Sequence, residues 1–200
     1  KMNMLLCYCI GKAAQCCEEF YLLPQGERML AYDQIGISVI VANAQDGINS
    51  CDIPFTDDLE TFNERYLHGT QTVRETWSDL TAEDCMMIGT SAWVDYEVDG
   101  AINMYSGIYN NPFLIWGKYK EEGEKITLKI SFQFHHVQMD GREACEFLKR
   151  LQEEADEWKW GESGGEGRAS SFHQTAEGTI YAMSSERYRT AEEKRSICHL

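Results

Sequence analysis

Two adjacent histidines, His135 and His136, are followed by Asp140 and Gly141 in the segment FHHVQMDG. Imidazole exchanges a proton near neutral pH, so a histidine held at the edge of a cleft is suited to act as a general base. Two histidines at a strand end are also found as half-buried polar residues. An Asp-Gly pair before a helix is also found as a turn with a cap. The spacing alone leaves both interpretations open.

A metal site is a third interpretation of the same residues. Only His135, His136 and Asp140 are available locally as ligands. No other cluster in the sequence completes a coordination shell around them. We therefore expect no metal site.

The histidines lie where a predicted strand meets a predicted helix. Before them, apolar residues alternate with polar ones, which predicts a strand with one apolar face: Ile126, Leu128, Ile130, Phe132 and Phe134. After them, apolar residues recur every three or four positions, which predicts an amphipathic helix: Ala144, Phe147, Leu148, Leu151, Ala155 and Trp158. Such a corner positions the histidines rigidly.

The length and charge limit the kind of protein this is. The 200 residues suit one domain with a substantial core, and the net charge is −15. Nucleic acids and anionic membranes require a basic surface, so we expect neither as a partner. A polyanionic cofactor remains possible because it requires only a local basic patch.

The eight cysteines form neither a paired CxxC zinc pattern nor the framework of a small disulfide-rich domain. We expect reduced, buried thiols and a cytoplasmic location. No apolar run is long enough to span a bilayer.

Further elements follow from local patterns. We expect a helix with Leu6 and Phe20 on its apolar face that stops near Pro24, strands over 28–32 and 35–42, and a short helix capped by Thr56. Strand-like segments cover 85–96 and 113–120, with a hairpin turn at 121–124. Residues 161–167 read as a flexible linker, so we predict one domain over 1–160 and a flexible tail over 161–200.

The chain resembles the classical, trimeric chloramphenicol acetyltransferases over about residues 4–158. The resemblance is carried by PFLIWGKY at 112–119, HHVQMDG at 135–141 and IGTSAWV at 88–94. HHxxxDG is shared with other coenzyme-A-dependent acyltransferases and with peptide-synthetase condensation domains. The chain length and the spacing from the Lys-Tyr pair to the histidines favour the acetyltransferase.

The resemblance implies an α/β fold, a two-layer sandwich with a mixed sheet covered by helices on one side. It implies a homotrimer with active sites between subunits. It also implies transfer of an acetyl group from acetyl-coenzyme A to a hydroxyl of chloramphenicol, and thus antibiotic resistance, or of a similar small acceptor.

The resemblance also assigns residues. His136 is the general base, which agrees with the chemistry, because a hydroxyl must lose its proton as it attacks a thioester. Asp140 is structural and pairs with an arginine. Trp93, Lys118 and Tyr119 match positions that line the coenzyme channel.

The chain departs from the family at two positions of the site. The serine that stabilises the oxyanion falls at Gly89, and Thr90 or Ser91 substitutes only if the strand register shifts. Losing such a donor costs a factor of about 10²–10³, so we expect Gly89→Ser to raise turnover. A threonine near the Lys-Tyr pair is replaced by Ile115, which removes a hydroxyl that binds water.

A third departure lies before Lys1, where the family has a strand and a helix that carry the arginine partner of Asp140. Arg142 or an arginine of the tail is a possible substitute. Two alternatives therefore remain beside the acetyltransferase. One is an O-acetyltransferase for another acceptor, and the other is a degenerate paralogue that binds coenzyme A or only assembles.

Overall fold

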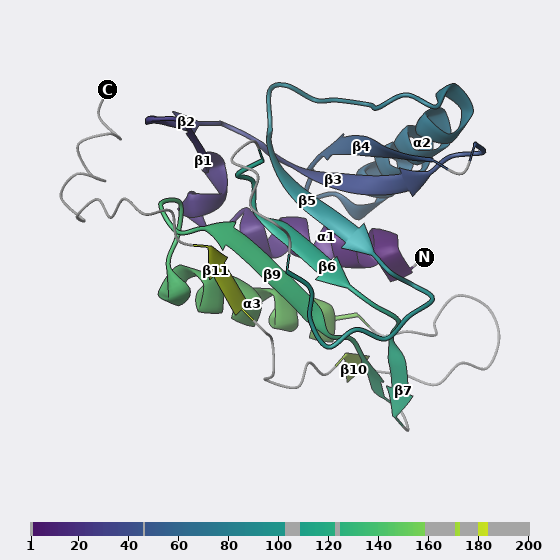
Figure 1. Ribbon diagram of the computed structural model, residues 1–200. Coiled ribbons are helices and arrows are strands. Elements are labelled where there is room, and N and C mark those ends of the chain that lie inside the picture. Colours follow the sequence, from purple (N-terminus) through teal and green to yellow (C-terminus); the bar gives the residue numbers. More distant parts are fainter. Residues whose placement is uncertain are drawn as a thin grey trace.

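A six-stranded mixed sheet forms the centre of the computed structural model, which describes residues 2–45, 47–102, 109–122, 125–158, 171–172 and 180–183. Its strand order is β11-β9-β6-β5-β3-β4 (Figure 1). The strands of this sheet are β3 (Ile35–Ala42), β4 (Ile48–Pro54), β5 (Met86–Ala92), β6 (Phe113–Trp116), β9 (Ile130–His135) and β11 (Ile180–Met183).

The strand directions decide where functional side chains can meet. β3, β5 and β6 run parallel to one another, whereas β9 is antiparallel to β6. The register pairs Phe113 with Gln133 and Trp116 with Ile130. As a result, β5 and β6 end at one edge of the sheet and β9 ends at the opposite edge.

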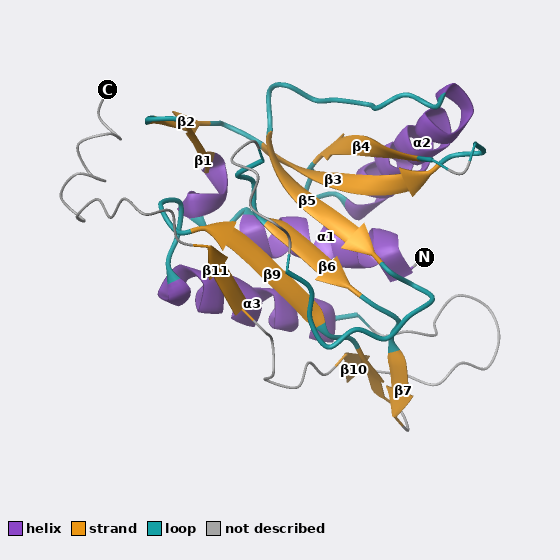
Figure 2. Cartoon of the chain, in the orientation of Figure 1, coloured by secondary structure: helices purple, strands orange, loops and turns teal. Residues whose placement is uncertain are grey.

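Helices of the described chain cover one face of this sheet (Figure 2). They are α1 (Met2–Ala14), α2 (Leu59–Thr76) and α3 (Gly141–Asp156). Buried side chains from all three pack against Ile37, Ile88, Leu114 and Phe132 in one hydrophobic core. The predicted two-layer α/β sandwich is confirmed.

An aromatic cluster fixes α3 against the strand that carries the histidines. The ring of Phe147 on α3 lies 4.6 Å from that of Phe20 and 4.9 Å from that of Phe132 on β9. All three side chains are almost fully buried. Because Phe20 belongs to the 3₁₀ helix η1 (Glu18–Tyr21), the cluster joins three segments around the end of β9.

The face of the sheet that points away from the helices, called here the outer face, carries the alternate residues of β5, β6 and β9. Strand alternation places on it Met87, Gly89, Ser91, Phe113, Ile115, Ser131, Gln133 and His135. Part of this face is crossed by the loop after β5. The carbonyl of Ala101 in this loop accepts hydrogen bonds from the side chains of Ser131 and Gln133.

The remaining described elements are short. β1 (Leu22–Gln25) and β2 (Arg28–Ala31) form a hairpin, and β7 (Lys120–Glu122) pairs antiparallel with β8 (Lys125–Thr127). β10 (Ser171–Phe172) pairs with β8 and β11 with β9, both in parallel. The other residues of 161–200 lie outside the described residues, so the flexible tail stays a prediction.

Most predicted elements are confirmed, with shifted ends. The predicted strand over 35–42 is β3, and the predicted amphipathic helix is α3. The first helix ends earlier than predicted, at Ala14, and Pro24 lies inside β1 instead of only stopping a helix. The predicted cap Thr56 is wrong, because α2 is capped by Asp58, whose carboxylate accepts from the Thr61 amide.

The thiols also differ in part from expectation. Cys7, Cys9, Cys17, Cys51 and Cys85 are free and buried, whereas Cys16 and Cys145 are free and exposed. Burial raises the pKa of Cys7 and of Cys9 to about 12, which keeps both thiols protonated. No helix in the described part of the chain is long and apolar enough to cross a membrane.

Candidate active site

The two histidines occupy a tight corner between β9 and α3. β9 ends at His135, and the amides of Gln138 and Met139 turn back to donate to the His135 carbonyl at 2.8 and 3.3 Å. α3 begins at Gly141. We call residues 135–140 the histidine corner.

The side chain of Gln138 connects this corner to the segment of η1 and β1. Its Nε2 donates to the carbonyls of Leu22 at 2.5 Å and Glu19 at 3.0 Å, and the residue is only 4% exposed. Buried hydrogen bonds between segments far apart in sequence hold a turn in one conformation. No pattern in the sequence indicated this role.

His135 is bound in a way that weakens it as a base. Its Nδ1 accepts a hydrogen bond from the Val137 amide at 3.2 Å, so the neutral ring carries its proton on Nε2. Burial, and secondarily the charge of His136, lowers the pKa of His135. A neutral ring whose lone pair accepts a backbone hydrogen bond is a weaker base than a free imidazole.

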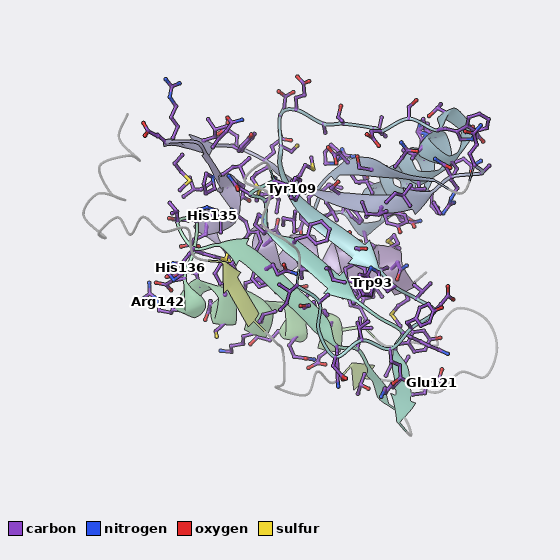
Figure 3. The ribbon with its side chains drawn as sticks, viewed as in Figure 1. Trp93, Tyr109, Glu121, His135, His136 and Arg142 are labelled. Carbon is purple, nitrogen blue, oxygen red and sulfur yellow. The ribbon has the colours of Figure 1, made fainter. Side chains whose placement is uncertain are left out.

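His136 follows the end of the strand and is half-buried. Figure 3 shows it close to Arg142 at the start of α3, away from Trp93, which lies at the other end of the sheet. His136 lies in the turn directly after β9, and the general-base role assigned to it stays a prediction.

Asp140 acts as the N-cap of α3. Its carboxylate accepts from the Arg142 amide at 2.9 Å, and the Glu143 side chain accepts from the Asp140 amide, which completes a capping box. The Arg142 guanidinium pairs with Glu143 at 2.9 Å. In the described part of the chain no ion pair joins Asp140 to an arginine, so the predicted pairing stays a prediction.

Thr90 and Ser91, the predicted substitute donors, lie on opposite faces of the sheet. Thr90 is 2% exposed on the helix-covered face, and its hydroxyl donates to the Ser38 carbonyl at 2.9 Å. Ser91 lies on the outer face and accepts from Trp93 Nε1 at 3.1 Å. Of the two residues, only Ser91 is partly exposed.

The strand directions separate these residues from the histidine corner within one chain. Trp116 pairs with Ile130, five residues before His135, which corresponds to about 17 Å along the strand. Trp93 and Lys118 follow the ends of β5 and β6 and lie at the far edge. One protomer therefore does not bring His136 together with Trp93, Lys118 or Tyr119.

Gly89 is a glycine because its neighbours approach closely. A Cβ added there would overlap the Phe113 ring, with Cε2 at 2.6 Å, and would lie 2.7 Å from the Tyr109 hydroxyl. Real Cβ atoms do not approach other atoms so closely. The family's serine thus has no space here unless Phe113 moves.

A cavity of about 680 Å³ opens at the far edge of the sheet. It is lined by Met2, Asn3, Tyr66, Leu67, His68, Thr70, Gln71, Arg74, Val94, Trp116, Gly117, Lys118, Tyr119 and Leu128. This lining includes the predicted cofactor residues Lys118 and Tyr119. Trp93 is not part of it, although its neighbour Val94 is.

The cavity is basic in an acidic protein. Arg74 and Lys118 supply positive charge, and none of the described residues that line it is Asp or Glu, although the chain carries a net charge of −15. Arg74 was not predicted, because nothing in the sequence brings α2 next to the end of β6. Such a cavity suits an anionic ligand. Among the described residues no group of His, Cys, Asp and Glu could hold a metal ion.

Comparison with known proteins shows which sequences this chain resembles. The family model described as chloramphenicol acetyltransferase matches residues 1–152. Chloramphenicol acetyltransferase 3 of Escherichia coli is 22% identical over 158 residues, which cover 76% of this chain and 74% of that protein.

Solved structures share the fold. A chloramphenicol acetyltransferase superposes with a TM-score of 0.64 at 18% identity and covers 77% of each chain. The dihydrolipoamide acetyltransferase (E2p) of Azotobacter vinelandii, studied for the role of a serine, a histidine and an asparagine in its catalytic mechanism, has a TM-score of 0.54 at 16% identity. That match covers 76% of this chain and 66% of the other.

We expect Gly89→Ser to destabilise the protein instead of restoring a donor, which reverses the expectation from sequence. Overfilling a packed site costs about 1–3 kcal/mol, because Phe113 must leave its position. Urea unfolding of Gly89→Ser beside Ser91→Ala, the next outer-face position on β5, measures this. Equal stability of Gly89→Ser and the wild type would contradict the packing argument.

We also expect His135 to make folding pH-dependent. Its pKa lies below the ordinary value of 6.5 in the folded chain, so the unfolded chain binds the proton first as the pH falls below 6.5. Stability present at neutral pH is therefore lost toward pH 5.5. In His135→Asn the amide oxygen can still accept from Val137 but does not titrate, so its stability should fall less between pH 7.5 and 5.5.

The matched control for this comparison is His68→Asn, at an exposed position on α2. Chemical denaturation at the two pH values gives the difference for each variant. An identical loss of stability in wild type and His135→Asn would show that His135 titrates normally.

Proposed function

Because the chain belongs to the chloramphenicol acetyltransferase family, we propose that it transfers the acetyl group of acetyl-coenzyme A to a hydroxyl of chloramphenicol or a similar small acceptor. The family match over residues 1–152 carries this proposal. The histidine corner supports it, since backbone hydrogen bonds and the Gln138 side chain hold the turn that carries His136 in one place.

His136 is the general base in this proposal. It takes the proton of the acceptor hydroxyl while that oxygen attacks the thioester carbonyl, which forms a tetrahedral oxyanion. The oxyanion collapses, the carbon–sulfur bond breaks, and the leaving thiolate takes the proton from the imidazolium. The studied histidine and asparagine of the Azotobacter enzyme lie four residues apart, as His136 and Asp140 do here.

Acetyl-coenzyme A is proposed to bind at the basic cavity. Its phosphates require positive charge, which Lys118 and Arg74 supply, and Tyr119 offers an aromatic ring for the adenine. Trp93, 46% exposed beside Ser91 on the outer face, lies at the same edge of the sheet and extends the proposed coenzyme site.

A homotrimer completes the site in this proposal. Within one chain, His136 and the coenzyme residues lie at opposite edges of the sheet, because β9 is antiparallel to β6. A neighbouring copy can place its histidine corner against the Ser91 and Trp93 edge of the first. The separation inside one protomer thus supports an active site between copies.

The cellular setting is proposed from the same features. Free thiols, including the exposed Cys16 and Cys145, fit a reducing compartment, so we place the enzyme in the cytoplasm. There, acetylation of chloramphenicol would confer antibiotic resistance. If the acceptor is another hydroxylated molecule, the same residues carry the reaction.

The proposal is tested by thiol release from acetyl-coenzyme A with chloramphenicol and with other small alcohols. We expect His136→Ala to lower kcat by about 10²–10⁴, because the attacking hydroxyl keeps its proton. His135→Asn should keep most of the activity. Equal losses in both variants would sink the assignment of the base, and release that no acceptor stimulates would sink acetyl transfer.

Removing positive charge from the cavity should weaken cofactor binding. We expect Lys118→Ala and Arg74→Ala each to raise the KM for acetyl-coenzyme A roughly fivefold to tenfold with little change in kcat, since a partly exposed ionic contact contributes about 1 kcal/mol. Lys149→Ala, on the exposed surface of α3, is the control.

The effect should depend on the phosphates of the cofactor. With acetyl-pantetheine, which lacks the nucleotide, wild type and the two cavity variants should show the same KM. A KM for acetyl-coenzyme A that neither substitution raises would place the cofactor elsewhere.

A further inference from the structure

Tyr109 is held firmly in the segment that leads into β6. The Asn110 side chain donates to the Pro24 carbonyl and the Asn111 side chain to the Met87 carbonyl, both at 2.8 Å. The Tyr109 ring meets the Phe113 ring edge-on, with centroids 6.1 Å apart and planes at 77°. Figure 3 shows Tyr109 beside β5. These contacts fix where its hydroxyl lies.

That hydroxyl occupies the space of a side chain at Gly89. Its oxygen lies 2.7 Å from the point where a Gly89 Cβ would be, on the outer face of the sheet. Although the residue as a whole is 49% exposed, the hydroxyl end points inward against β5. Within the described part of the chain, no hydrogen bond uses this hydroxyl.

The hydroxyl is a stable proton donor. Burial, and secondarily the negative charge of Asp52, raises the pKa of Tyr109 above its ordinary value of 10. The group therefore stays protonated at every pH at which the histidine corner would act as a base. A protonated phenol hydroxyl can donate to a bound molecule.

Acyl transfer requires such a donor. Negative charge develops on the thioester oxygen in the transition state, and a preorganised hydrogen bond to it is a large part of catalysis. The Thr90 hydroxyl is committed to Ser38 on the other face. The Ser91 hydroxyl lies on the outer face, where it accepts a hydrogen bond from Trp93 Nε1. Its own O–H can still donate, so Ser91 is the competing donor.

We propose that the Tyr109 hydroxyl donates the hydrogen bond that stabilises the oxyanion, in place of a side chain at Gly89. The inference rests on the proposed acetyl transfer. The register places Gly89 in one row with Phe113 and Gln133 on the outer face, next to the row of Ser91, against which the histidine corner of a neighbouring copy is proposed to lie. A carbonyl held over this row meets the hydroxyl, while His136 comes from the histidine corner of a neighbouring copy.

Tyr109→Phe tests this, because it deletes the oxygen and keeps the ring against Phe113. We expect kcat to fall by about 10²–10³, the usual cost of a lost oxyanion donor. The KM for acetyl-coenzyme A and the melting temperature should stay the same, since the bond forms only in the transition state. Tyr96→Phe, at a residue 73% exposed, is the matched control and should retain full activity.

Parallel measurements on His136→Ala and Ser91→Ala separate the possible failures. If His136→Ala loses activity and Tyr109→Phe does not, the role of Tyr109 is overturned and acetyl transfer stands. If Ser91→Ala alone falls a hundredfold, the donor is Ser91 and the inference is equally overturned. If wild type releases no more thiol than His136→Ala with any acceptor, the proposed function fails, and the role of Tyr109 fails with it.

Discussion

The antiparallel pairing of β9 with β6 is the constraint on which the rest of the molecule depends. Because β5 and β6 run the other way, the histidine corner and the basic cavity form at opposite edges of one sheet. In the proposed function, a single protomer holds both halves of the acyltransferase site without joining them. This separation supports the proposed site between copies of the chain.

Rigid elements hold the histidine corner, as proton transfer demands. Packing of Phe147 on Phe132 sets α3 against β9, and the amide of Gln138 fixes the turn to η1 and β1. Asp140 begins the helix with its carboxylate. Each contact uses a different kind of force, so the loss of one leaves the others to keep His136 near its place.

The sequence predicted the corner well and its surroundings poorly. Alternation and helical periodicity located β9 and α3, since both signals are local. The strands β1 and β4 were not predicted, because Pro24 argues against a strand and residues 48–54 mix polar and apolar types. The sequence did not predict the roles of Arg74, Gln138 and Tyr109. Each lies next to a segment that is distant in sequence, and such contacts leave no periodic signal.

Gly89 illustrates how a hydroxyl group at one place in a fold can come from a different residue. The resemblance to the family implies a lost serine at this position. In the structure, Phe113 and the hydroxyl of Tyr109 already fill the space that a side chain would take. A transition state responds to the position and acidity of a donor and not to the residue that supplies it. A hydroxyl delivered across the sheet by a neighbouring loop therefore meets the same physical requirement. Because Gly89 has no side chain, this hydroxyl can approach β5 closely.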